Sequence, residues 1–201
     1  MNPYFKTPPV VKNLIVINLL AYMATAMLPV GRQIMDYCSL YWFTSPFYHS
    51  YQFITYMFLH GSFEHIFFNM FALWMFGRSL EYDLGSKRFL TYYFVCGVGA
   101  ALIQMATVWF TGEYHVQLIG ASGAVMGLLL AFGVLHPNAV IMLLIPPIPI
   151  KAKWFVIIYG VIELFSGWRG IGNVAHFAHV GGMLWGLLLL YWWRRQGKIR
   201  F

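Results

Sequence analysis

The chain has few charged residues and few cysteines. Only 9% of its 201 residues are Asp, Glu, Lys or Arg, against about 25% in an ordinary soluble domain. That shortage excludes a soluble globular protein with a solvated surface. Two cysteines, Cys38 and Cys96, cannot form a disulfide framework and are interpreted as buried free thiols. Hydrophobic residues make up 60% of the chain and aromatic residues 19%, which places it among membrane proteins.

The basic residues do not form the continuous patch that nucleic-acid binding needs, although the net charge is +7. Six apolar segments, given below, could each span a membrane. In that arrangement eleven of the 13 lysines and arginines fall on one side, and only Arg32 and Arg169 fall on the other. An excess of Lys and Arg marks the cytoplasmic side. We therefore expect both termini to be cytoplasmic and no nucleic acid as a partner. The eleven residues are Lys6, Lys12, Arg78, Lys87, Arg88, Lys151, Lys153, Arg194, Arg195, Lys198 and Arg200.

Six apolar segments predict an all-α membrane protein in which residues 1–201 form a single domain. These transmembrane segments cover approximately residues 11–30, 63–80, 87–110, 122–136, 152–168 and 178–193. The fourth segment stops before Pro137 and is roughly 22 Å long at 1.5 Å per residue, shorter than a hydrocarbon core of about 30 Å. Its Ser122 end is therefore expected inside the bilayer. Irregular backbone at that depth is tolerated only where it is buried in protein or lines a water-filled cavity.

Ser122 and His179 each stand at the head of an apolar segment, on the side opposite the termini. Ionisable groups at membrane depth are costly and indicate function. A serine hydroxyl needs a base to take its proton, and His179 is the candidate. No Asp or Glu is clearly placed to orient His179, so the sequence favours a dyad over a triad. Glu163, inside the fifth segment, is interpreted as a structural pairing residue.

Small residues recur at four-residue spacing in the two segments that begin near Ser122 and His179. The stripes are Gly123, Gly127 and Ala131 in the fourth segment and Ala178, Gly182 and Gly186 in the sixth. Small-xxx-small patterns let membrane helices approach backbone to backbone. This approach would bring the serine to the histidine, although helix packing alone would also explain the pattern.

His65 and Asn69 lie four residues apart at the start of the second segment, so they share one helix face. Both can donate hydrogen bonds to an oxyanion, and the first turn of the fourth helix can add backbone N–H groups. A simple bond between neighbouring helices is the alternative interpretation of the pair.

The seven histidines do not form a metal motif. There is no H-E-x-x-H sequence, no accompanying cluster of carboxylates, and no pair of adjacent histidines such as membrane di-iron enzymes use. We therefore expect no metal and no other cofactor.

Four motifs together resemble the rhomboid intramembrane serine proteases. They are His60-Gly-Ser-Phe-Glu-His65-Ile-Phe-Phe-Asn69, Gly77 to Gly85, Gly120-Ala121-Ser122-Gly123 and Ala178-His179-Val180-Gly181-Gly182. A lone G-x-S-G is a weak signal, but all four in the family's order are specific. The resemblance implies a six-helix, rhomboid-like bundle with a short fourth helix that starts inside the bilayer.

The resemblance also implies the role of each site residue. Ser122 would be the nucleophile and His179 its base, while His65 and Asn69, with the backbone N–H groups of Ala121 and Ser122, would form the oxyanion hole. Structural roles would fall to His60, Gly120, Gly123, Glu81, Gly182 and Gly186. The implied partners are transmembrane protein substrates and the lipid bilayer, with cleavage near the non-cytoplasmic side. Short loops and the absence of extra domains suggest a bacterial plasma membrane.

Two positions depart from the family pattern. Some members carry Trp-Arg where this chain reads Tyr51-Gln52, and many carry an aromatic residue beneath the base where this chain has Met126. Methionine can also pack against a ring through its sulfur, so the second change bears on rate more than on reaction type. Two alternatives stay open: a catalytically silent rhomboid-like protein that binds membrane clients, and a small channel. The oligomeric state is left open.

Overall fold

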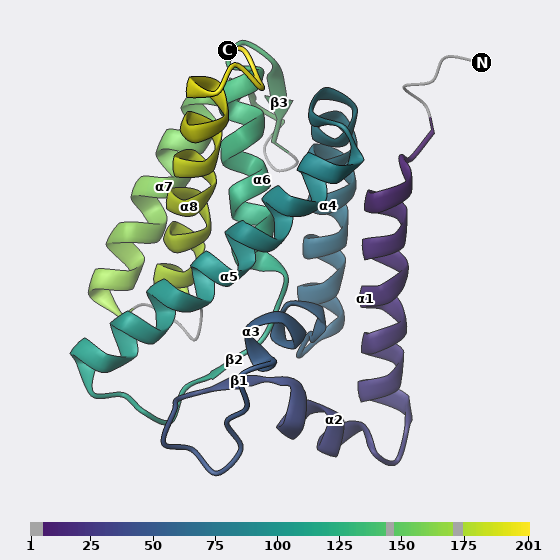
Figure 1. The fold of residues 1–201 in the computed structure, drawn as a ribbon, viewed down its shortest axis with the longest axis vertical. Helices are drawn as coiled ribbons and strands as arrows, with labels where there is room; N and C mark the ends of the chain where they lie inside the picture. Colours follow the sequence, from purple (N-terminus) through teal and green to yellow (C-terminus); the bar gives the residue numbers. More distant parts are fainter. Residues whose placement is uncertain (1–5, 144–146, 171–174) are drawn as a thin grey trace.

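The computed structural model describes residues 6–143, 147–170 and 175–201. Six long helices make up most of the described residues, and short elements connect them (Figure 1). The long helices are α1 (Pro9–Met27), α4 (Phe63–Leu84), α5 (Ser86–Thr111), α6 (Ser122–Leu135), α7 (Ala152–Arg169) and α8 (His176–Arg195). The short elements are α2 (Gly31–Cys38), β1 (Leu40–Tyr41), α3 (Gln52–Thr55), a 3-10 turn (Tyr56–Phe58), β2 (Gln117–Leu118), β3 (Val140–Met142) and β4 (Pro149–Lys151).

Local sequence explains where the long helices begin and end. Pro9 occupies the first turn of α1, where a missing N–H costs nothing. The side chain of Ser62 caps α4 by accepting a hydrogen bond from the backbone N–H of His65 at 3.1 Å. Gly85, with a φ of 77°, ends α4 and lets α5 start at the next residue. Such a φ is strained for residues that carry a Cβ.

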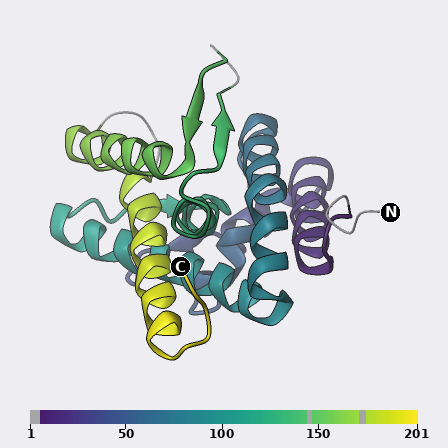
Figure 2. The same cartoon turned by 90° about the horizontal axis from the view of Figure 1, so that it is seen from above.

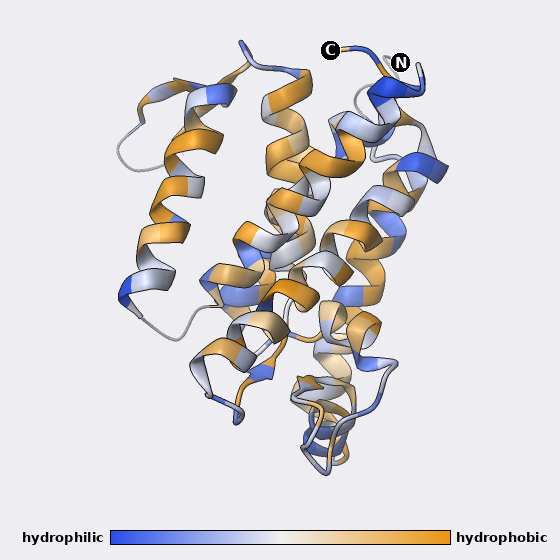
Figure 3. Ribbon diagram, turned by 60° about the vertical axis from the view of Figure 1, so that its left-hand side comes forward, coloured by the Kyte–Doolittle hydropathy of each residue, from blue (hydrophilic) through white to orange (hydrophobic). Residues whose placement is uncertain are grey.

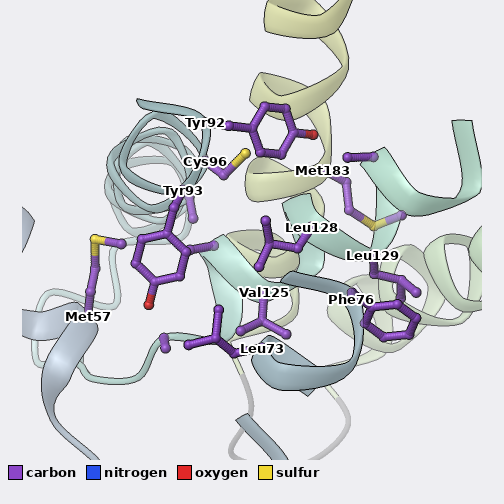
Figure 4. Packing of buried hydrophobic residues seen from close by; sticks show 14 of the residues in the cluster. Met57, Leu73, Phe76, Tyr92, Tyr93, Cys96, Val125, Leu128, Leu129 and Met183 are labelled. Carbon is purple, nitrogen blue, oxygen red and sulfur yellow. The ribbon is translucent and has the colours of Figure 1, made fainter. Parts of the chain in front are cut away.

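Helix α6 lies at the centre of the bundle. Viewed from above, it is seen end-on with α4, α5, α7 and α8 around it, while α1 packs outside α4 (Figure 2). Val125, Leu128 and Leu129 of α6 lie between side chains of α4, α5 and α8 (Figure 4). The start of α1 and the end of α8 lie at the same end of the molecule, and α6 starts towards the opposite end (Figure 1).

Glu81 of α4 fastens α1 to the bundle. Its carboxylate is buried and accepts hydrogen bonds from the backbone N–H groups of Val10 at 3.0 Å and Val11 at 2.8 Å. It also accepts one from the hydroxyl of Ser86 at 2.7 Å. Helix α1 has no side-chain cap of its own, so a residue of another helix satisfies its first backbone donors.

Among the described residues, two helices are both long and apolar enough to cross a membrane, namely α1 and α5. Helix α6 is a shorter apolar helix. Hydrophobic residues run along the long helices, and hydrophilic residues gather mostly at their ends (Figure 3). Length and hydropathy thus mark two of the six predicted spans among the described residues.

The expectation of an all-α chain holds for most of the described residues but misses two small antiparallel sheets. Strand β1 pairs with β2, with Leu40 opposite Leu118, and β3 pairs with β4, with Ile141 opposite Ile150. The first sheet ties the long connection after α1 to the segment that leads into α6. Strands of two or three residues carry too little periodic pattern to be recognised in a sequence.

Candidate active site

Ser122 is the first residue of α6 and follows a backbone turn that requires glycine. Gly120 has a φ of 117°, and its N–H donates a hydrogen bond to the carbonyl of Tyr56 at 2.9 Å. A Cβ on Gly120 would lie 2.7 Å from Nε2 of His65. The glycine therefore serves two needs, the unusual φ and the close approach of the His65 ring.

Helices α6 and α8 touch along their small-residue stripes. A Cβ on Gly182 would collide with the backbone carbonyl of Gly123, and one on Gly127 would lie 3.1 Å from the carbonyl of Gly182. A Cβ on Gly186 would collide with the hydroxyl of Tyr92, on α5. The two backbones can approach this closely only because these positions lack side chains.

This approach brings Ser122 and His179 together. Nε2 of His179 lies 2.8 Å from Oγ of Ser122, which is hydrogen-bond distance for a nucleophile and its base. His179 is 7% exposed and stands in the first turn of α8. The two residues come from opposite sides of a helix–helix contact, so each is held by a packed helix.

Glu163 of α7 lies on the other side of the His179 ring. Its Oε2 atom is 3.0 Å from Nδ1 of His179 and 2.7 Å from Nδ1 of His176, and Tyr159 adds a hydrogen bond to the same carboxylate. The sequence analysis found no Asp or Glu positioned to orient His179. The structure differs, because Glu163 lies 3.0 Å from its ring. Two spacings in the sequence could have indicated this contact. His176 precedes His179 by three residues and Tyr159 precedes Glu163 by four, so each pair lies on one helix face.

His65 and Asn69 lie on α4, facing the same cavity as Ser122 and His179. The backbone N–H of Gly61 donates to Nδ1 of His65 at 3.5 Å, which leaves Nε2 as the protonated nitrogen of the neutral ring. The side-chain amide of Asn69 donates one hydrogen bond to the carbonyl of His65 at 2.8 Å. An amide nitrogen has two N–H groups, so Asn69 retains a second donor for the cavity.

His60 packs edge-on against His65, with ring centroids 4.9 Å apart. It is buried in the segment before α4. Burial, followed by the neighbouring His65 ring, lowers the pKa of His60 from its ordinary 6.5 to about 4. His60 is thus a neutral ring that supports His65.

Gln52 organises the aromatic-rich connection between α1 and α4. It is fully buried, and its amide nitrogen donates to the carbonyls of Tyr37 at 2.9 Å and Phe47 at 2.7 Å. Its carbonyl oxygen accepts from the backbone N–H of His49 at 3.1 Å. The residue that departs from the family's Trp-Arg pair therefore cross-links the loop with its own amide.

A cavity of about 720 Å³ within the bundle is lined by Ser122, His179, Glu163, His65 and Asn69. Met126, the second departure from the family pattern, lines the cavity beside Ser122 and His179. The full lining is Glu64, His65, Phe68, Asn69, Ala72, Gln117, Leu118, Ile119, Ser122, Val125, Met126, Tyr159, Glu163, Ala175, His176 and His179.

Glu163, His176 and His179 are also the described residues that could hold a metal ion, because their donor atoms lie within 4.8 Å of one another. The two histidine–carboxylate contacts, at 2.7 and 3.0 Å, are shorter than the roughly 3.3 Å between neighbouring ligand atoms of a tetrahedral zinc ion. The spacing suits protons shared between these groups better than a common ion.

A family model, the rhomboid domain, matches residues 42–196. Rhomboid protein 1, mitochondrial, of Saccharomyces cerevisiae is 33% identical over 144 residues, covering 68% of this chain and 39% of the yeast protein. Presenilin-associated rhomboid-like protein A, mitochondrial, of Danio rerio is 32% identical over 154 residues, covering 72% and 39%. Rhomboid-like protein 11, chloroplastic, of Arabidopsis thaliana is 30% identical over 192 residues, covering 89% and 63%. The chain thus spans less than two thirds of the length of each.

These relatives overturn one expectation. The names of the yeast, zebrafish and Arabidopsis proteins place them in mitochondria or chloroplasts, and they point to an organellar membrane rather than a bacterial plasma membrane with cytoplasmic termini. The expectation was wrong because short loops and hydropathy report that a chain enters a bilayer, not which bilayer. The match to the family model covers most of the chain, and with it the segments that hold Ser122, His179, His65 and Asn69, so the chain belongs to the rhomboid family.

Proposed function

We propose that this chain is an intramembrane serine endopeptidase that hydrolyses peptide bonds in transmembrane segments of membrane proteins. The observation that carries the proposal is the 2.8 Å contact between Nε2 of His179 and Oγ of Ser122. It lies in a cavity inside the helical bundle, where an unused polar pair would be costly.

In the proposed reaction, Oγ of Ser122 attacks the carbonyl carbon of the scissile bond while Nε2 of His179 takes the hydroxyl proton. The histidine then gives this proton to the leaving amine, and the acyl chain stays on Ser122. A water molecule, deprotonated by the same nitrogen, releases the acyl product and restores the serine.

The negative charge on the tetrahedral intermediate needs donors that are already in place. His65 and Asn69 supply side-chain N–H groups from α4, and the backbone N–H groups of Ala121 and Ser122 supply two more at the start of α6. Gly120 keeps the His65 ring close to Ser122 because it has no side chain. No metal or organic cofactor takes part in these steps.

The six long helices are proposed to cross the bilayer, with the cavity nearer the face opposite the termini and the basic clusters. The substrate would reach Ser122 from the lipid, past α7, whose outward side chains are apolar and exposed. A transmembrane helix hides its backbone, so the segment has to unwind before its carbonyl can reach the serine.

The test is cleavage of a reporter transmembrane segment by the full chain in liposomes, with Ser122→Ala and His179→Ala beside the wild type and a chelator in one arm. We expect cleavage by the wild type, unchanged by chelator, and none by either variant. Cleavage by both variants at the wild-type rate would contradict the proposal, and loss of activity with chelator would favour a metal at Glu163, His176 and His179. Tight binding of segments without cleavage would instead favour a silent protein that holds membrane clients.

A further inference from the structure

We propose that Glu163 is a positioning residue for His179, so that the site works as a Ser122–His179–Glu163 triad. This role depends on the proposed function and sharpens it. The contact that carries it is the 3.0 Å distance between Oε2 of Glu163 and Nδ1 of His179, with Ser122 on the opposite ring nitrogen.

The burial pattern of α7 sets Glu163 apart from the rest of its helix. Helix α7 buries only Ala152, Val156 and Glu163, and the glutamate is 4% exposed. At position 163, α7 therefore buries a carboxylate against the bundle, although burying an apolar side chain there would cost less free energy. A buried carboxylate is retained only where partners compensate for its lost hydration. Here His176 forms a hydrogen bond with it at 2.7 Å, and the proposed base lies at ion-pair distance, 3.0 Å away.

In this proposal, Glu163 selects which nitrogen of His179 carries the proton. A carboxylate oxygen only accepts hydrogen bonds, so Nδ1 of His179 faces Glu163 as the donor. Nε2 then bears a lone pair, and it is the atom next to the hydroxyl of Ser122. When Nε2 takes the serine proton, the ring becomes an imidazolium, and the negative charge of Glu163 stabilises it without being protonated itself. The proton leaves again from Nε2 to the departing amine.

His176 shares the same oxygen. Its Nδ1 has hydrogen-bond geometry to Oε2 at 2.7 Å, whereas Nδ1 of His179 meets that oxygen at ion-pair distance without hydrogen-bond alignment. Catalytic hydrogen bonds are often poorly aligned before substrate binds and tighten in the complex.

The experiment measures how fast a fluorophosphonate probe, which reacts with activated serines, labels the full chain in detergent, alongside kcat and KM on the reporter segment. For Glu163→Gln we expect labelling and kcat to fall by about 10²–10⁴-fold, because a glutamine can hold His179 in the wrong tautomer. KM and the thermal unfolding midpoint should stay near the wild-type values. Glu163→Asp, which keeps the charge, should restore part of the rate.

The matched control is Glu113→Gln, which removes an exposed carboxylate that does not line the cavity and should label like the wild type. Wild-type labelling by Glu163→Gln overturns the role of Glu163. Failure of the wild type to label any faster than Ser122→Ala would instead overturn the proposed function, so the two failures are distinct.

A second measurement needs no folded variant of Glu163. In wild-type chain with ¹⁵N-labelled histidine, the ring signals of His179, assigned by their absence from His179→Ala, should show a protonated Nδ1 and an unprotonated Nε2 near neutral pH. The reverse tautomer would overturn the proposal.

Discussion

Helices α7 and α8 follow one another in the chain and pack side by side, yet the bundle holds them very differently. Helix α8 is buried at intervals along its whole length, from Ala178 to Trp193, and its glycines meet backbone and side chains of α5 and α6. Helix α7 buries three residues and exposes most of its large apolar side chains. In Figure 1 it stands at the edge of the molecule.

The difference divides the proposed chemistry between a tightly packed part and an edge. Ser122 and His179 lie on α6 and α8, where packing leaves little room for movement. Glu163 lies on α7, which has fewer packed partners and borders the proposed path for substrate. Displacement of α7 would therefore leave the serine and its base in contact but would remove the carboxylate that orients the base.

The largest expected effect comes from filling the contact between α6 and α8. Gly182→Leu would place side-chain atoms where the backbone of Gly123 lies, so we expect loss of both cleavage and the folded state, measured by reporter cleavage and thermal unfolding. Gly160→Leu on α7 is the control, because a Cβ there meets only the flexible Met183 side chain, at 3.3 Å. Equal damage from both variants would remove the contrast between the two helices.

Next is the removal of an oxyanion donor from the tightly packed part. Asn69→Ala should lower kcat by about 10²–10³-fold because one preorganised N–H is lost. The thermal midpoint should change far less than in Gly182→Leu. A variant that keeps the wild-type kcat would mean that Asn69 only bonds its own helix, through the carbonyl of His65.

The pH dependence of stability tests whether His60, which packs against His65, is buried as a neutral ring. The pKa of His60 is lowered to about 4 in the folded state from an ordinary 6.5. Between these values the unfolded chain takes up a proton that the folded chain does not, so the free energy of unfolding should fall as pH drops from about 6.5 to about 4, at up to about 1.4 kcal/mol per pH unit. This contribution is absent above pH 6.5.

Denaturation of the wild type and of His60→Asn across this range measures the contribution of His60. The variant should show the shallower slope, since the other titrating groups are common to both proteins. Identical slopes would exclude a buried neutral His60 as the cause.

The smallest expected effect is on the outer face of α7. Ile158 is 50% exposed, so Ile158→Ala should change the free energy of unfolding in detergent by no more than about 0.5 kcal/mol. Leu128→Ala in α6, at a position that is 0% exposed, should cost about 2–5 kcal/mol through the cavity it leaves. A large loss from Ile158→Ala would show that α7 has a packed partner on that face.

Sequence reasoning was effective where position along the chain carries the signal. Ser122 and His179 open apolar segments, and the glycine spacing indicates which helices touch, so their meeting could be predicted before any geometry was known. The family followed from four motifs in order, and the match to the rhomboid model confirms it. Free thiols at Cys38 and Cys96 were also predicted correctly, although Cys38 is only half-buried.

Other features depended on information that one sequence does not contain. Glu163 could face any side of α7 until the rotation of that helix about its axis is known, so its contact with His179 was missed. The pairing of Leu40 with Leu118 joins two very short strands far apart in the chain. The role of Gln52 depends on hydrogen bonds to backbone carbonyls of the surrounding loop. No pattern of residue types in the sequence predicts such bonds.

The attachment of α1 has a consequence for the order in which the protein is assembled. The N–H groups that open α1 are satisfied by Glu81, which leaves the ribosome about 70 residues later, as those contacts are 70 and 71 residues apart. During synthesis the first turn of α1 therefore lacks the Glu81 hydrogen bonds until α4 has been made and packs beside it. Helix α1 is made before α4, but its first turn can dock only after Glu81 has been made.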